Sequence, residues 1–324
     1  MPDISVIVRS MDRPVLSRAL ASVAAQDVAD GTAAEVLVVA ACGAAHRPVA
    51  HRAGRFECRL VFGEGALDRP RAANAGLDAA RGRFITFLDD DDELLPDQFS
   101  SMLAVLEANP AVDLVHARSQ AVDPAGNLLY LYGGPWVAWR QLSHGFFQLA
   151  AVMFRRELLE RGVRFDERLE ILEDLEFFVQ CARVGRFQYL ARPVSRYYVM
   201  DGSSGTGDGE NRDGGRVQRA LAYIQEKWNG LAQELAATAP ARVARAQDLL
   251  RRGGYQAALM CLAPLLDTTP EDINALNLGA LAHIHLGHFD VAESLLKAAL
   301  TVLPGHPGLR ANLELLERKR RGIT

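Results

Sequence analysis

Short apolar runs alternate with longer stretches of helical periodicity over the first 115 residues. Such runs are typical of buried strands, and here they span residues 4–8, 35–40, 59–62, 84–88 and 112–115. The stretches between them predict helices over residues 14–25, 70–80 and 96–108, each beginning at a proline, which the first helical turn accepts. This alternation predicts βαβ units and an α/β fold with a mostly parallel sheet, in which ligands bind beyond the carboxyl ends of the strands.

The regular alternation ends before residue 200. Residues 117–198 predict two strands around a turn at 123–127, and a helix over 173–182. Residues 201–215 contain six glycines and four acids, a composition that packs no core. Residues 216–237 then predict a helix with an apolar stripe formed by Leu221, Ile224, Trp228, Leu231 and Leu235.

The last 85 residues contain an internal repeat of 34 residues. Glycine, small, apolar and turn positions recur at this spacing, with Gly253, Ala258, Leu262 and Pro270 matched by Gly287, Ala292, Leu296 and Pro304. The period resembles the tetratricopeptide (TPR) repeat, a pair of antiparallel helices. We therefore predict an α/β domain over residues 1–200, a glycine-rich loop or linker over 201–215, and an all-α domain over 216–324. The all-α domain would hold TPR-like repeats at 239–272 and 273–306 and a capping helix at 309–318.

Composition places the chain among ordinary globular proteins, with 49% hydrophobic and 23% charged residues and a net charge of −4. This balance indicates no nucleic-acid partner. The apolar runs are too short for a signal-peptide core or a membrane span, so we expect a cytoplasmic protein without a transmembrane segment. Attachment to the inner face of the membrane stays open. The four cysteines have no metal-ligand spacing, and the excess of arginine over lysine indicates a GC-rich bacterial genome.

Five consecutive acids, residues 89–93, directly follow the apolar run at 84–88. Adjacent carboxylates repel one another, and a divalent cation would relieve that repulsion. Mg²⁺ and Mn²⁺ prefer oxygen ligands and commonly bridge to substrate phosphates. The alternative is a solvated acidic turn that favours the N-terminus of the helix beginning near Pro96.

Four motifs in order resemble the family 2 glycosyltransferases of GT-A fold, over residues 3 to about 200. They are the strand and loop at 4–14 with the helix at 18–26, the helix at 73–82, the strand and acids at 84–92, and Phe165-Asp166-Glu167 followed by Glu173-Asp174. The resemblance implies an inverting, metal-dependent enzyme that transfers a sugar from a nucleotide diphosphate donor. A UDP-sugar is the first donor to expect, and a glycan, a lipid-linked sugar or a protein is the expected acceptor.

The same resemblance assigns roles to individual residues. Asp89 or Asp90 would contact the donor ribose, and Asp91, with Asp89, would hold Mn²⁺ or Mg²⁺ on the diphosphate. Arg9 and Ser10 lie in the first motif and are expected beside the donor. Asp174 matches the catalytic base, although two acids here would also stabilise the first turn of a helix.

Two positions depart from the family pattern. The family usually has acidic residues after the second strand, one of which contacts the nucleobase, whereas this chain reads Ala40-Ala41-Cys42. An arginine often precedes the asparagine aligned with Asn74, and here Ala73 stands there. Arg71 or Arg69 would then reach the diphosphate, unless these are ordinary surface arginines.

Three features bear on partners. The aromatic-rich segment with Trp136, Trp139, His144, Phe146 and Phe147 suits a sugar or lipid-linked acceptor, or else it is core. The glycine-rich segment would close over the donor or serve as a tether. The TPR-like repeats would bind a protein partner or a protein acceptor. An alternative function is a catalytically weak sugar-nucleotide-binding scaffold that acts through these repeats, and a nucleotidyltransferase is less favoured because residues 9–14 lack a glycine-rich phosphate loop.

Overall fold

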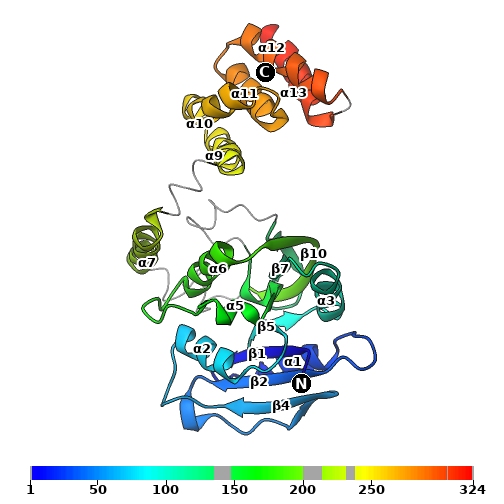
Figure 1. Ribbon diagram of the computed structural model, residues 1–324, viewed down its shortest axis with the longest axis vertical. Helices are drawn as coiled ribbons and strands as arrows, with labels where there is room; N and C mark the ends of the chain where they lie inside the picture. The colour runs from blue at the N-terminus through cyan, green and yellow to red at the C-terminus, as the bar shows by residue number, and fades with distance from the viewer. Residues whose placement is uncertain (1, 135–146, 200–213, 231–237, 305, 323–324) are drawn as a thin grey trace. The chain divides into compact units, whose positions relative to one another are not determined.

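The computed structural model describes residues 2–134, 147–199, 214–230, 238–304 and 306–322. The chain divides into two compact units, one reaching to Lys227 and the other beginning at Trp228 (Figure 1). Each unit is described by itself.

The first unit contains a mixed sheet of ten strands. Its order is β3-β4-β2-β1-β5-β9-β7-β10-β6, with β8 paired to β7. The strands are β1 Ile4–Ser10, β2 Ala34–Ala40, β3 Arg52–Ala53, β4 Phe56–Val61, β5 Phe84–Asp89, β6 Glu93–Leu94, β7 Leu114–Val122, β8 Leu128–Tyr132, β9 Val152–Arg155 and β10 Phe187–Tyr198. Strands β4, β2, β1 and β5 run parallel, as do β7 and β10.

Helices cover both faces of this sheet. They are α1 Leu16–Ala24, α2 Arg69–Ala79, α3 Gln98–Ala108, α5 Glu157–Glu160, α6 Glu173–Val184 and α7 Gly214–Lys227, with short 3-10 turns at Gly43–Ala45 and Leu149–Ala151. One core joins α1 and α3 to alternate residues of β1, and the other joins α2 and α6 to the opposite side. Because the central strands are buried on both faces, they read as continuous apolar runs rather than as alternating patterns.

The predicted α/β architecture is confirmed, and each strand and helix predicted up to residue 115 overlaps an observed element. The two-residue strands β3 and β6 were not predicted, and β7 continues to Val122, beyond the predicted end at residue 115. Sequence periodicity did not predict β9, which inserts antiparallel between β5 and β7. Only four residues long, β9 contributes Val152, Met153 and Phe154 to the core. So short an apolar run carries too little periodicity to distinguish a strand from a helix.

Local sequence explains how α2 reaches its place on β1. The Asp68 side chain accepts a hydrogen bond from the Arg71 amide at 3.0 Å and caps the helix, and Pro70 fills its first turn. Gly76 then crosses β1 so closely that a Cβ atom there would lie 2.2 Å from Cγ2 of Ile7. The helix therefore needs glycine at this position.

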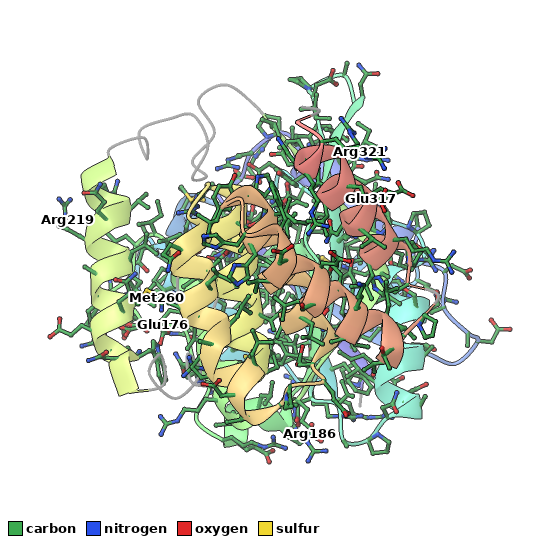
Figure 2. The ribbon with its side chains drawn as sticks, turned by 90° about the horizontal axis from the view of Figure 1, so that it is seen from above. Glu176, Arg186, Arg219, Met260, Glu317 and Arg321 are labelled. Carbon is green, nitrogen blue, oxygen red and sulfur yellow. The ribbon has the colours of Figure 1, made fainter. Side chains whose placement is uncertain are left out.

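Helix α7 belongs to the first unit, which differs from the predicted boundary near residue 215. Lys227 Nζ lies 2.7 Å from both Asp166 Oδ2 and Glu176 Oε1, and the Tyr223 hydroxyl donates to Asp166 at 2.7 Å. Glu176, a residue of α6, lies next to the inner side of α7, whereas Arg219 of α7 points outward (Figure 2). The apolar stripe of this segment predicted an amphipathic helix, but not which unit would bury it.

The second unit is all helical over its described residues. Its helices are α9 Ala239–Arg251, α10 Tyr255–Thr268, α11 Ile273–His285, α12 Phe289–Val302 and α13 Pro307–Arg320. Helices α9 and α11 begin 34 residues apart, as do α10 and α12, so the helical repeat is in register. Gly253 and Gly287 both have positive φ, +75° and +79°, where the chain turns between the paired helices. Glu317 and Arg321, one turn apart at the C-terminal end of α13, form a surface ion pair (Figure 2).

The corresponding interior positions of the two helix pairs are equally buried. Ala246 and Ala280 are fully buried, as are Ala258 and Ala292. These small residues permit close helix packing, which is why they recur at the repeat period. The assignment of the repeats to the TPR class stays a prediction.

None of the helices in the described ranges has the length and apolar character that a bilayer crossing requires.

Candidate active site

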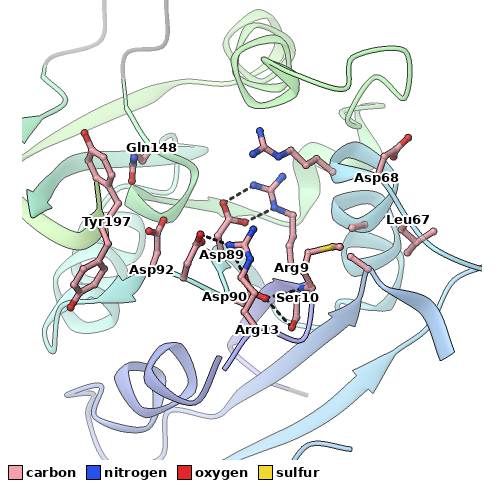
Figure 3. Close-up of a pocket in the computed structure, with 16 residues that line it drawn as sticks. Arg9, Ser10, Arg13, Leu67, Asp68, Asp89, Asp90, Asp92, Gln148 and Tyr197 are labelled. Atoms are coloured by element: carbon pink, nitrogen blue, oxygen red, sulfur yellow. Dashed lines mark hydrogen bonds and ion pairs between the residues drawn. The ribbon is translucent and has the colours of Figure 1, made fainter. Parts of the chain in front are cut away.

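The site forms where β1 and β5 end side by side. Arg9 and Asp89 are register partners of these two parallel strands, so their side chains emerge at the same edge of the sheet. A pocket opens there (Figure 3), lined by Arg9, Ser10, Met11, Arg13, Ala41, Leu67, Asp68, Arg69, Ala72, Asp89, Asp90, Asp91, Asp92, Gln148, Tyr197 and Tyr198. Five carboxylates and three guanidinium groups therefore share one small volume.

Arg9 joins two parts of the site. Its Nε and Nη2 donate to the two oxygens of Asp89 at 2.7 and 2.9 Å, and its Nη1 donates to Glu173 Oε1 at 2.8 Å. Burial lowers the pKa of Arg9, but Asp89 and Glu173 outweigh burial and raise it. Burial likewise raises the pKa of Asp89, and the Arg9 charge outweighs this effect and lowers it. Arg9 and Asp89 therefore stabilise each other's charged forms.

Asp90 is directed inward and organises the loop after β1. This carboxylate, only 2% exposed, accepts from the Met11 amide at 2.8 Å and from the Ser10 hydroxyl at 3.2 Å. Ser10 Oγ also lies 2.8 Å from Nε2 of the buried His46 and accepts from the Asp12 amide at 3.0 Å. Ser10 and Asp90, both predicted to bind the donor, thus have their polar atoms engaged in holding the loop that forms one wall of the pocket.

Asp91 and Asp92 have different surroundings. The Asp91 carboxylate accepts a hydrogen bond from Arg13 Nη1, and its backbone carbonyl accepts from Arg18 at 2.8 Å. The Asp92 carboxylate faces the pocket, and no hydrogen bond to it is found within the described part of the chain. Burial, together with the charges of Asp89 and Asp91, raises the pKa of Asp92 well above its ordinary value.

Asp174 lies in the first turn of α6, beside the Glu173 that Arg9 contacts. Leu172, directly before the helix, has a left-handed φ of 61°, a conformation uncommon for a residue other than glycine. This residue sets the direction in which α6 begins. Burial raises the pKa of Asp174 to about 6, with the Glu173 charge acting in the same direction.

The two candidate arginines of α2 occupy different positions. Arg71 lies outside the residues that line the pocket, and it pairs with Asp68 and Glu167, each at 3.3 Å. Arg69 lines the pocket. After Arg9, its charge also lowers the pKa of Asp89. Of the two predicted phosphate contacts, the geometry thus favours Arg69.

Other predicted features are not part of the pocket. Phe147 is 2% exposed and stacks on His116, with ring centroids 4.4 Å apart, so it is a core residue. Trp136, Trp139, His144 and Phe146 lie outside the described residues, as does nearly all of the glycine-rich segment. Their predicted roles stay untested.

Sequence reasoning missed His46, Arg13 and Gln148. Arg13 stands within the first motif, at residues 4–14, but the motif assigned it no role. Gln148 and His46 stand in no motif, and His46 acts on the pocket only through its bond to Ser10. Arg13 lies in the loop between β1 and α1, and its proximity to the acids became apparent only from the pairing of β1 with β5. Tyr197 and Tyr198, at the end of β10, also line the pocket and belong to none of the sequence motifs.

A family model described as "Glycosyl transferase family 2" matches residues 5–191, more than half of the chain. This chain therefore belongs to glycosyl transferase family 2. The match begins in β1 and ends within β10, so it contains both Asp89–Asp92 and Asp174.

The names of two curated relatives refer to polysaccharide biosynthesis in bacteria. The succinoglycan biosynthesis protein ExoO of Rhizobium meliloti is 32% identical over 195 residues, which are 54% of this chain and 54% of the relative. The amylovoran biosynthesis glycosyltransferase AmsB of Erwinia amylovora is 25% identical over 189 residues, 52% of this chain and 58% of the relative. The chain thus spans little more than half the length of these relatives.

A solved structure resembles the whole chain. The crystal structure of S. aureus TarS 1-349 in complex with UDP-GlcNAc aligns with a TM-score of 0.54 at 16% identity, covering 100% of this chain and 93% of that one. At this identity the likeness establishes the fold, and it agrees with the predicted GT-A class.

Proposed function

We propose that this chain is a metal-dependent inverting glycosyltransferase. It would transfer a sugar from a nucleotide diphosphate donor to an acceptor hydroxyl in the synthesis of a bacterial glycan or glycoconjugate. The observation that carries the proposal is the Arg9 bridge, which links Asp89 of the acidic pocket to Glu173, the neighbour of Asp174. Asp174 itself lies outside the residues that line the pocket. Under this proposal, the acids expected at the donor and the candidate base would act on the same substrates from the two ends of this bridge.

Among the described residues, no three acidic, histidine or cysteine side chains are grouped as a complete metal site. A divalent cation would therefore be held by one or two carboxylates of the acidic pocket together with the donor phosphates. Hard cations such as Mn²⁺ and Mg²⁺ are held by carboxylate oxygens. Asp92 offers a carboxylate without a hydrogen-bond partner in the described ranges, and Asp91 is next to it. Both oxygens of Asp89, the other predicted ligand, accept bonds from Arg9, so we assign Asp89 the positioning of that arginine. When bound, the ion would stabilise negative charge on the departing diphosphate.

Asp174 is the proposed base. The acceptor oxygen would attack the anomeric carbon while the bond from that carbon to the diphosphate oxygen breaks, and the nucleoside diphosphate leaves with the electron pair. The acceptor proton passes to the Asp174 carboxylate. A pKa of about 6 leaves this group mostly ionised at neutral pH, as a base requires. A single displacement of this kind inverts the configuration at the anomeric carbon.

Charge in the pocket also supports a diphosphate-bearing donor. Arg69 lies at the start of α2, where the helix N-terminus itself favours an anion. A guanidinium at that place pairs well with phosphate oxygens. Ala41 lines the pocket in the segment after the second strand where the family resemblance implies acidic residues, so recognition of the nucleobase would differ here. UDP-sugars are the donors to test first, because the TarS structure contains UDP-GlcNAc.

A screen for thermal stabilisation by nucleotide sugars, with and without Mn²⁺, tests this proposal directly. A donor at 100 times its dissociation constant adds about 2.7 kcal/mol to stability. The expected result is metal-dependent stabilisation by one donor, followed by release of its nucleoside diphosphate. Binding without any turnover would favour the sugar-nucleotide-binding scaffold, and an absence of binding by every donor would contradict both functions.

The remaining expectations concern location and partners. A cytoplasmic location stays a prediction, and so does a protein partner or acceptor on the helical repeats. The prediction of a protein partner or acceptor rests only on the 34-residue register of the helix pairs.

A further inference from the structure

Strand β8 carries an unusual surface for an edge strand. Leu128, Leu129, Tyr130 and Leu131 are consecutive and each is between 44% and 57% exposed. Edge strands normally carry charges or prolines that prevent association. Of the two faces of this strand, the one that carries Tyr130 and Tyr132 also has hydroxyl groups that a ligand can bond.

Two tyrosines of β8, Tyr130 and Tyr132, lie next to Tyr197, which lines the pocket. The hydroxyls of Tyr130 and Tyr197 are 2.7 Å apart, and the rings of Tyr130 and Tyr132 each lie 6.4 Å from the Tyr197 ring. Tyr130 and Tyr197 are both register partners of Ala121 on β7, whose small side chain leaves the space between the rings open. Since Tyr197 lines the pocket, the three tyrosines continue its wall outward.

One member of this tyrosine cluster (Tyr130, Tyr132 and Tyr197), namely Tyr132, lies within electrostatic reach of the candidate base. Burial is the main cause that raises the pKa of Tyr132, and the Asp174 carboxylate is the next. An acceptor whose hydroxyl meets Asp174 would therefore pass close to Tyr132.

A fourth group at the same end of the pocket has unsatisfied hydrogen-bonding capacity. Gln148 lies beside Tyr197 and Asp92 (Figure 3). Its Oε1 is buried and has no hydrogen-bond partner in the described ranges. An unpaired buried amide oxygen is costly, and a hydroxyl group of a ligand would satisfy it.

From this arrangement we infer that Tyr130, Tyr132, Tyr197 and Gln148 form an acceptor subsite for a saccharide ring. Aromatic rings offer a flat apolar face to the C–H face of a sugar, and tyrosine hydroxyls and an amide bond its hydroxyl groups. A lipid chain would use neither the hydroxyls nor the amide oxygen. The inference rests on the proposed function, because it specifies the acceptor of the same reaction.

The opposite face of β8 provides a matched control. Leu131 alternates with Tyr130 and Tyr132, so it points to the other side of the strand, where its partner is Gln120. Leu131 is 44% exposed, close to the 51% of Tyr130. A substitution at Leu131 thus perturbs the same strand without touching the tyrosine cluster.

The experiment uses the full chain with Mn²⁺ and the UDP-sugar that stabilises it most. Release of UDP in the absence of an acceptor measures the part of the reaction that depends on the donor alone. Transfer to methyl β-glucoside, methyl β-galactoside and methyl N-acetyl-β-glucosaminide, each paired with its octyl counterpart, measures the acceptor half-site. Variants are Y130A, Y130F, Q148L and the control L131S.

We expect the wild-type chain to use at least one methyl glycoside. Y130A should raise the KM for that glycoside about fivefold to tenfold, since one aromatic contact contributes on the order of 1 kcal/mol. Y130F, which keeps the ring, should have a smaller effect, and Q148L should also raise the KM. UDP release without acceptor should stay within about twofold of wild type in Y130A, and L131S should match wild type throughout.

Three results would overturn the inference while leaving the proposed function intact, provided UDP release persists. They are an unchanged KM in Y130A, equal losses in L131S and Y130A, and use of octyl but not methyl glycosides, which would indicate a lipid contact instead. If the chain binds no donor and releases no UDP, the proposed function fails, and the acceptor subsite fails with it.

Discussion

Arg9 is 164 residues from Glu173 in the chain, yet its Nη1 donates to Glu173 Oε1 at 2.8 Å. Both side chains are almost fully buried, with exposures of 10% and 4%. Because the same guanidinium holds Asp89, one arginine connects the end of β5 to the start of α6.

Replacing Arg9 by alanine should destabilise the first unit strongly. Glu173 would lose its counter-charge in a buried ion pair, which costs about 3–5 kcal/mol to break, whereas Asp89 is 39% exposed and contributes less. Urea unfolding, with and without a nucleotide sugar, measures this change. As a control, R83A removes an ion pair whose arginine side chain is 54% exposed, and it should change stability by no more than about 1 kcal/mol. Equal effects of R9A and R83A would contradict the bridging role.

Asp174 should set the acid limb of the pH–rate profile. Its ionised form accepts the proton, so transfer should rise as pH increases through about 6 and level off above that value. D174N should retain donor binding in a thermal-shift assay while transfer falls about 100-fold to 10,000-fold. Transfer at the wild-type rate in D174N would assign the base elsewhere.

The charge of Glu173 should affect the pH at which the acid limb of the pH–rate profile has its midpoint. It is the second cause, after burial, of the raised Asp174 pKa, so E173Q should lower the Asp174 pKa. The midpoint of the acid limb would then move to lower pH in a profile of transfer rate against pH. A midpoint that stays in place would mean that another group limits the rate.

Asp92 should be required for the metal-dependent part of donor binding. D92N removes one charge from a group of adjacent acids, so the metal-free chain should keep its stability or gain slightly. Stabilisation by Mn²⁺ with donor should largely disappear. The control D78N changes an exposed acid on α2, which pairs with Arg164 and lies outside the pocket, and it should leave the Mn²⁺ response intact. Full Mn²⁺ stabilisation in D92N would remove Asp92 from the metal site.

Lys227 should fasten α7 to the first unit. Its ammonium compensates Glu176, which is fully buried, so K227M should destabilise the docking of α7 by about 1–3 kcal/mol. Hydrogen exchange across α7 measures this docking. K297M, which breaks an exposed pair one helical turn apart on α12, is a control that should leave α7 exchange unchanged.

Acid should loosen the same contact. Burial raises the Asp166 pKa, but hydrogen bonds from Arg168, Lys227 and Tyr223 outweigh this effect and hold it well below its ordinary value. The stabilisation is therefore complete above about pH 4 and is lost as pH falls further. Faster exchange of α7 in acid, with the central strands still protected, is the expected pattern. Acid-insensitive exchange would contradict it.

Much of the fold followed from the chain alone. Apolar runs and helical stretches predicted the strands and helices of the α/β unit, since burial of β1, β2 and β5 on both faces requires continuous apolar sequence. The 34-residue repeat predicted the helix pairs of the second unit, because buried alanines must recur wherever helices pack closely. The acidic cluster after β5 and the acids at the start of α6 were likewise evident as motifs.

Other features required the tertiary structure. No spacing in the chain distinguishes Arg69 from Arg71, and only the rotation of α2 on β1 directs one toward the pocket and the other toward Glu167. The assignment of α7 to the first unit depends on a lysine meeting a buried glutamate 51 residues earlier. Likewise, the tyrosines of β8 approach Tyr197 only because both strands pair with β7. Local periodicity determines which segments become strands and helices, whereas long-range strand pairing decides which side chains share a site.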